Sequence, residues 1–141
     1  MGLRITTLSE NTAGRGLLAE WGLSFLIESD EITILLDSGK SIVASHNADT
    51  LGIDLSRVDK IILSHGHSDH TGGLKQVLRK INKEIEIIAH PDIWAVKYRH
   101  HEGKEDRPMG IPFPRPAGED IGRSIETLVH SLRNFADNLA S

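Results

Sequence analysis

The chain has 141 residues, of which 38% are hydrophobic and 26% are charged, and this composition predicts one soluble domain with a single core. Its net charge of −4 includes no basic excess that would neutralise phosphates, which argues against nucleic acid as the main partner. The lack of cysteine excludes disulfides and thiolate-bound metals. The lack of a long apolar run or a signal-peptide pattern predicts a cytoplasmic protein without a membrane partner.

In chain order, the apolar patterns predict strands that alternate with helices. A first strand is followed by a hairpin around Ser29-Asp30-Glu31, because two β-branched runs flank this short polar turn. The expected strands span residues 3–8, 23–28, 32–37, 59–63 and 85–89, and the expected helices span 41–51 and 74–81. This alternation is typical of an α/β (α+β layered) domain.

The last third of the chain has a different character. Residues 102–118 are first charged and then rich in glycine and proline, which predicts a loop. Residues 119–139 are predicted to form an amphipathic C-terminal helix, which either packs over a sheet or associates with its own copy. Its apolar side chains follow a spacing of four and three: Ile121, Ile125, Leu128, Leu132, Phe135 and Leu139.

The strongest chemical signal is the segment Ser64–Gly73, which connects a predicted buried strand to a predicted helix. His65 and His67 are two residues apart, so an extended backbone points both imidazoles the same way. Asp69 and His70 follow directly at the turn into the helix. One pair could hold one metal ion and the second pair another. Imidazole nitrogen and carboxylate oxygen suit zinc, and also iron or manganese.

This H-x-H-x-D-H segment resembles the signature of the metallo-β-lactamase superfamily. Asp37, at the end of a predicted strand, is similar to an earlier aspartate motif of that superfamily. The branch most similar to this chain contains dihydropterin-ribofuranosylaminobenzene-phosphate synthase-like proteins, and the runs that carry this resemblance are 11–20, 22–28, His90-Pro91-Asp92 and Gly110–Phe113. The resemblance implies the N-terminal half of an αββα sandwich, and the C-terminal helix predicted from the apolar spacing would be added to it.

The resemblance also implies a set of site residues. His65, His67, Asp69 and His70 would be the metal ligands, and Asp69 would also orient the attacking water. Asp37 would accept a hydrogen bond from a ligand histidine and so set its tautomer. The remaining expected pocket residues are Asn11, Arg15, His90 and Asp92.

In the superfamily that this segment resembles, a complete site holds two metal ions that share a bridging water. It uses a third histidine, a bridging aspartate and a final histidine from a second half of the fold, and the sequence shows no motif for them. Three explanations stay open: a fragment, a natural half-domain that pairs with itself, or a ligand set rebuilt locally. The residues available for local rebuilding are His90, Asp92, His100, His101 and Asp106. Because a lone half would leave one apolar sheet face bare, we expect a homodimer formed by that face or by the tail helix.

The functional hypothesis is a metal-dependent hydrolase that acts on a small-molecule phosphoester, ester or amide through a metal-activated water. One alternative is a pterin-linked transferase of the synthase type, in which the metal site assists a condensation. Another alternative, from a different class, is a truncated metal-binding module without catalytic activity. Zinc is the expected cofactor, with two ions in the complete family site.

Overall fold

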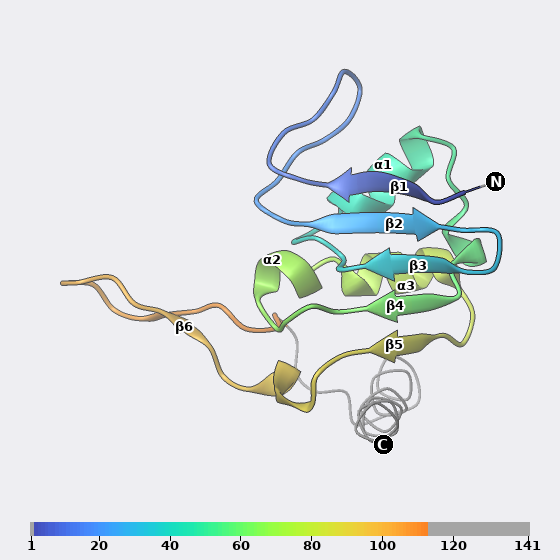
Figure 1. Ribbon diagram of the computed structural model, residues 1–141. Helices are drawn as coiled ribbons and strands as arrows, with labels where there is room; N and C mark the ends of the chain where they lie inside the picture. The colour runs from blue at the N-terminus through green and yellow to red at the C-terminus, as the bar shows by residue number, and fades with distance from the viewer. Residues whose placement is uncertain (1, 113–141) are drawn as a thin grey trace.

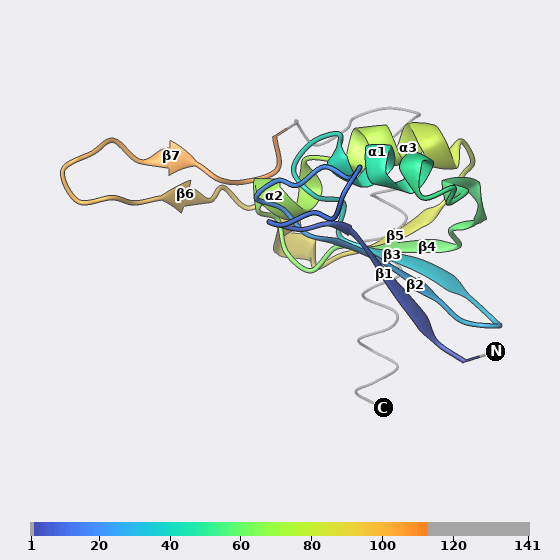
Figure 2. The same ribbon diagram turned by 90° about the horizontal axis from the view of Figure 1, so that it is seen from above.

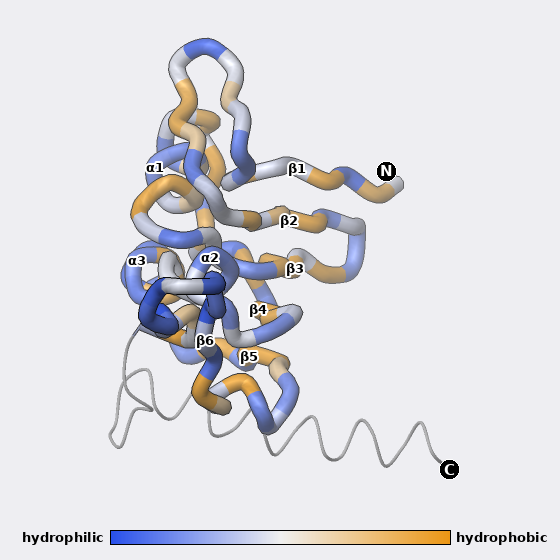
Figure 3. The backbone as a smooth tube through the Cα atoms, turned by 90° about the vertical axis from the view of Figure 1, so that its left-hand side faces the viewer, coloured by the Kyte–Doolittle hydropathy of each residue, from blue (hydrophilic) through white to orange (hydrophobic). Residues whose placement is uncertain are grey.

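A five-stranded mixed sheet forms the centre of the protein in the computed structural model, which describes residues 2–112. The strands follow one another in chain order across the sheet (Figure 1). The first three are antiparallel neighbours, whereas β3, β4 and β5 run parallel. Their bounds are β1 Arg4–Ser9, β2 Ser24–Glu28, β3 Thr33–Leu36, β4 Lys60–Ile62 and β5 Glu86–Ile88. The predicted strands and the hairpin between β2 and β3 are therefore confirmed, and in Figure 3 the hairpin turn is hydrophilic.

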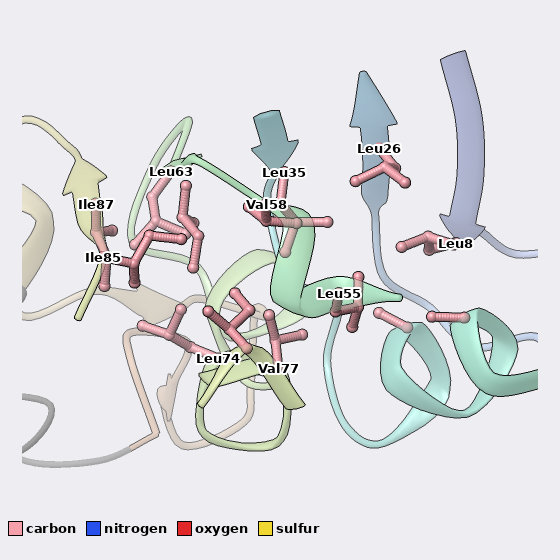
Figure 4. Packing of buried hydrophobic residues seen from close by; sticks show 14 of the residues in the cluster. Leu8, Leu26, Leu35, Leu55, Val58, Leu63, Leu74, Val77, Ile85 and Ile87 are labelled. Carbon is pink, nitrogen blue, oxygen red and sulfur yellow. The ribbon is translucent and has the colours of Figure 1, made fainter. Parts of the chain in front are cut away.

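Two helices, α1 (Val43–Thr50) and α3 (Leu74–Ile81), lie on the same side of this sheet (Figure 2). Alternate strand residues point to opposite faces, so one set of strand side chains packs under the helices. Figure 4 shows this core, in which Leu26 and Leu35 of the sheet and Leu74 and Val77 of α3 are almost completely buried. Both predicted helices are confirmed, with α1 two residues shorter at its start and one at its end. The 3-10 turn η1 (Leu55–Arg57) leads into β4.

A hairpin arm extends from the sheet beyond β5 (Figure 2). It begins after the 3-10 turn η2 (Pro91–Trp94) and pairs β6 (Tyr98–Arg99) with β7 (Arg107–Pro108). Within the predicted loop over residues 102–118, the described part (102–112) contains the two-residue strand β7, and residues 113–118 lie outside the described residues. Pro108 fits this edge strand, where no further strand needs its missing N–H. The predicted helix over 119–139 lies outside the described residues.

The sheet face opposite α1 and α3 carries a continuous apolar row. In register across four strands, this row pairs Phe25 with Leu36, Leu36 with Ile62, and Ile62 with Ile88. All four side chains are half-buried. Ile27 pairs with Ile34 in the next row of the same face. Among the described residues, both long helices lie on the other side of the sheet (Figure 2).

We expect this face to mediate a homodimer, because a two-fold pairing would remove apolar surface from water. The check is sedimentation velocity at micromolar concentration, where the native chain should sediment as a dimer. Ile34→Glu places a charge on the face and should yield monomers. Ile42→Glu is the matched control, since Ile42 is an exposed isoleucine next to α1. A native chain that sediments only as a monomer would contradict the expectation.

Candidate metal centre

The segment with the three histidines lies where the parallel strands end at their carboxyl edge. It leaves β4 after Ile62, runs extended to His67 and turns into the one-turn helix α2 (Ser68–Thr71). His67 is the residue before α2 and has extended backbone angles, φ −70° and ψ 147°. Asp69 and His70 therefore lie in the first turn of α2, which folds back over the strand end. This edge of an open α/β sheet is where ligands bind most often.

The structure brings three of the predicted ligands into one group. One ligand atom from each of His65, Asp69 and His70 lies within 4.8 Å of the other two. The imidazole rings of His65 and His70 have centroids 4.1 Å apart, and those of His65 and His67 are 4.7 Å apart. His67 is exposed and does not join the tight group. Whereas the sequence suggested two separate pairs, the fold of α2 brings His65 together with the Asp69-His70 pair.

Asp37 is a buried carboxylate that contacts this group through hydrogen bonds. It follows β3, its exposed fraction is 1%, and its backbone has a φ of +56°, which aspartate tolerates better than most residues. One oxygen, Oδ1, accepts a hydrogen bond from the Ser64 backbone N–H at 2.8 Å. The other, Oδ2, accepts from the Ser64 hydroxyl at 2.6 Å and lies 2.7 Å from Nδ1 of His70. The carboxylate thus ties the end of β3 to the residues that follow β4.

These bonds also determine the tautomers of two histidines. A carboxylate only accepts hydrogen bonds, so Nδ1 of His70 must carry the proton that is donated to Asp37. The single hydroxyl proton of Ser64 goes to Asp37, which leaves the Ser64 oxygen to accept from Nδ1 of His65 at 2.8 Å. In both rings Nε2 then holds a free lone pair. That is the form in which a histidine binds a metal.

The donor set fits a divalent metal ion. Burial lowers the pKa of His65, and the neighbouring His70 and His67 lower it further against the opposing effect of Asp37 and Asp69, so the ring is neutral at neutral pH. Oδ1 of Asp69 is buried and has no hydrogen-bond partner within the described part of the chain. A buried carboxylate oxygen without a partner is costly unless a cation or water completes it. Two neutral imidazoles and one carboxylate are a common zinc set.

Close backbone contacts hold the segment in place, and three glycines make them possible. A Cβ on Gly66 would lie 2.2 Å from the carbonyl oxygen of Ile93, and one on Gly73 would lie 2.0 Å from that of Ser38. A Cβ on Gly72 would lie 2.1 Å from the carbonyl oxygen of Lys40. Each contact is with backbone, which cannot rotate away as a side chain would. The loop 37–41 and η2 therefore press directly on the histidine segment.

We predict that Gly73→Ala lowers the stability of the fold by about 1–3 kcal/mol, the usual cost of forcing an extra methyl group into a packed site. The new methyl would push Ser38 away, and the neighbouring Asp37 with it. The measurement is the urea midpoint of unfolding. Gly14→Ala is the control, because a Cβ at Gly14 would meet nothing within 4 Å. Equal midpoints for both variants would contradict the prediction.

Several predicted pocket residues lie elsewhere. Asn11 and Arg15 are exposed on the connection between β1 and β2, which rises away from α2 in Figure 1, so their pocket role stays a prediction. His90 is exposed, and its Nδ1 accepts from the backbone N–H of Asp92 at 3.1 Å. It therefore caps η2.

Local rebuilding of the ligand set is not what the described residues show. His100 pairs with Asp106 at 2.7 Å across the exposed arm. In residues 2–112, neither of them, nor His90, Asp92 or His101, belongs to a group of three or more ligand atoms in close range. These side chains sit on η2 and on the arm, outside the tight group.

Sequence reasoning missed two residues that support the centre. Ser64 connects Asp37 to His65, as described above. Glu20 connects the end of β1 to the loop after β3. Its two carboxylate oxygens accept hydrogen bonds from the Ser9 hydroxyl at 2.9 Å, the Lys40 backbone N–H at 2.8 Å and the Ser41 hydroxyl at 2.5 Å. The only sequence signal for Glu20 was its place in a run that resembles the superfamily branch.

Comparison with known proteins gives consistent matches. The family model described as "Metallo-beta-lactamase superfamily" matches residues 22–133. A 7,8-dihydropterin-6-methyl-4-(β-D-ribofuranosyl)-aminobenzene-5'-phosphate synthase of Methanocaldococcus jannaschii is 42% identical over 68% of this chain and 35% of its own length. An atrochrysone carboxyl ACP thioesterase of Aspergillus fumigatus is 30% identical over 77% of this chain and 24% of its own.

Among solved structures, a metal-dependent hydrolase of the β-lactamase superfamily is similar at a TM-score of 0.59 and 31% identity. The likeness covers 77% of this chain and 36% of that one. It confirms the predicted α/β class and the fold. The chain thus spans about a third of the length of the first curated relatives that it matches. Within residues 2–112, no helix is long and apolar enough to cross a bilayer.

Proposed function

Because the chain belongs to the metallo-β-lactamase superfamily, we propose that it is a metal-dependent hydrolase of a small-molecule phosphoester, ester or amide. The observation that carries this proposal is the group formed by His65, Asp69 and His70, in which one buried carboxylate oxygen has no hydrogen-bond partner among residues 2–112. Zinc is the proposed ion, and iron or manganese would suit the same donors. His67, beside His65, completes the proposed ligand set.

The chemistry that such an ion supplies when bound is a lowered pKa for water and polarisation of the scissile group at neutral pH. The residues of this chain hold and orient the reacting groups. Asp37 keeps His70 in the tautomer with a free Nε2, and Ser64 does the same for His65. Asp69 has one oxygen 3.6 Å from Nε2 of His70 and a second, buried oxygen that could accept a proton from a nearby water. We assign Asp69 the role of orienting that water.

A second candidate is a pterin-linked transferase, in which the same residues would assist a condensation. The synthase from M. jannaschii, at 42% identity, favours it. A third is a metal-binding module without turnover, which is favoured by the ligand group of only three residues in the described part of the chain.

The test combines metal content with turnover. Separate samples of the purified chain are loaded with zinc, iron or manganese, dialysed and analysed for bound metal. The samples are then assayed with bis(4-nitrophenyl) phosphate and 4-nitrophenyl acetate. Bound zinc with turnover that chelator removes and zinc restores is the expected result. Bound zinc without turnover of either ester would favour the module. A chain that retains no metal from zinc, iron or manganese would overturn the proposal.

A further inference from the structure

A cavity of about 570 Å³ lies between the histidine segment and the base of the arm. Ser68, the first residue of α2, lines it, so the cavity and the candidate metal centre share a wall. The Ser68 backbone N–H also donates to the carbonyl of Met109 at 2.9 Å, which ties α2 to the returning strand of the arm. Neither the superfamily resemblance nor the proposed hydrolysis gives this cavity a role.

The walls of the cavity are mainly apolar. Trp94 and Ile111 pack against the buried core and form a fixed surface. Val96 contributes an exposed apolar surface at the rim, with an exposed fraction of 74%. A rigid aromatic and aliphatic surface of this kind favours a flat apolar group, because little side-chain freedom is lost on binding.

The charge of the cavity is opposite to that of the whole chain. Its described lining contains Lys40 and Lys97 and no carboxylate, although the chain has a net charge of −4. The larger cavity at the other end of the sheet is different, because acidic side chains outnumber basic ones in its lining. Positive charge against an apolar wall therefore distinguishes the cavity beside the histidines.

The two lysines have different roles. Nζ of Lys97 is held by the carbonyl of Ala95 at 2.9 Å, with those of Asp92 and Ile93 at 3.3 and 3.4 Å. It also lies 2.8 Å from where a Cβ on Gly66 would be, so its charge is fixed beside the residue between His65 and His67. Lys40 is exposed, and its ammonium group forms no hydrogen bond or ion pair with another residue in the described part of the chain.

We propose that this cavity is a substrate subsite that binds an organic anion with an aromatic body. The aromatic body would lie on Trp94 and Ile111, Lys40 would bind the negative group directly, and Lys97 would supply a fixed positive field. The inference rests on the proposed function, since it names the class of substrate that the hydrolase would hold next to its metal centre.

The binding test uses Trp21→Phe as the background, so that Trp94 is the only tryptophan and reports by fluorescence quenching. Three stable probes separate the contributions: 4-nitrophenylphosphonate has ring and charge, 4-nitrobenzyl alcohol has the ring alone, and methylphosphonate has the charge alone. We expect 4-nitrophenylphosphonate to bind most tightly. The affinity of methylphosphonate is measured by its competition with 4-nitrophenylphosphonate. Equal binding of either simpler probe would overturn the proposal.

Variants place the binding in this cavity. Lys40→Gln should weaken 4-nitrophenylphosphonate about tenfold, the size of one hydrogen bond to a charged group. Val96→Glu, at an exposed position, should weaken it as well by adding a negative charge at the rim. Lys83→Gln, which removes the same charge from the exposed turn after α3, should leave the affinity unchanged. Unchanged affinity in both Lys40→Gln and Val96→Glu would overturn the proposal.

Measuring both chelator-treated and zinc-loaded protein separates this proposal from the proposed function. Probe binding to the metal-free chain that depends on Lys40 would support the subsite even if no metal ever bound. Zinc binding with turnover, but with no loss of probe affinity in either Lys40→Gln or Val96→Glu, would leave the hydrolase standing and reject the subsite.

Discussion

His65→Ala should lose nearly all bound zinc, the largest single effect that we expect in this protein. His65 is central to the site, because its ring neighbours those of both His67 and His70 and its ligand atom belongs to the tight group. Several ligands must bind a metal ion together to hold it. Removing one ligand therefore lowers the metal affinity by more than the roughly 10–100-fold that follows the loss of a residue hydrogen-bonded to a ligand. Zinc content after dialysis is the measurement.

His67→Ala should also lose zinc, but less than His65→Ala, since the exposed His67 lies outside the tight group. His46→Ala is the control, because His46 is exposed on α1. Wild-type zinc content in both His65→Ala and His67→Ala would show that the H-x-H pair is not the metal site.

The histidine segment was predictable because its signal is local. Three signals follow one another within residues 59–73: a β-branched run, an H-x-H-x-D-H pattern and two glycines. They indicate a buried strand, a metal site and the start of a helix, in that order. Resemblance to the superfamily supplied Asp37, and the structure places that carboxylate 2.7 Å from His70. The grouping of His65 with Asp69 was not predictable in this way, because it depends on where α2 begins and how it turns.

Features that join distant parts of the chain gave no local signal. Lys40 and Lys97 line one cavity although 57 positions separate them, and no sequence pattern pairs them. The arm was missed because Tyr98–Arg99 and Arg107–Pro108 lack the alternating apolar pattern of a buried strand. Glu20 links the β1–β2 connection to the end of β1 and to the loop after β3 through hydrogen bonds that only the folded chain creates.

Asp37→Asn should leave zinc bound but about 10–100-fold weaker, the usual size of an outer-partner effect on a metal site. An amide has one oxygen and one NH₂ group, so it cannot accept at both positions as the carboxylate does. If the amide oxygen keeps the Ser64 backbone N–H, the NH₂ group faces Nδ1 of His70 and the Ser64 hydroxyl. The His70 proton then moves to Nε2, where it blocks the lone pair that binds metal.

Competition with a chelator of known zinc affinity measures this weakening. Asp49→Asn is the charge-matched control, since Asp49 is exposed and pairs with Lys80 away from the histidines. Ser64→Ala separates the two histidines, because it removes the hydroxyl beside His65 while His70 keeps its partner. The loss of zinc affinity in Ser64→Ala should therefore be smaller than the loss in Asp37→Asn. An Asp37→Asn chain that binds zinc as tightly as the Asp49→Asn control would show that this carboxylate does not orient the ligands.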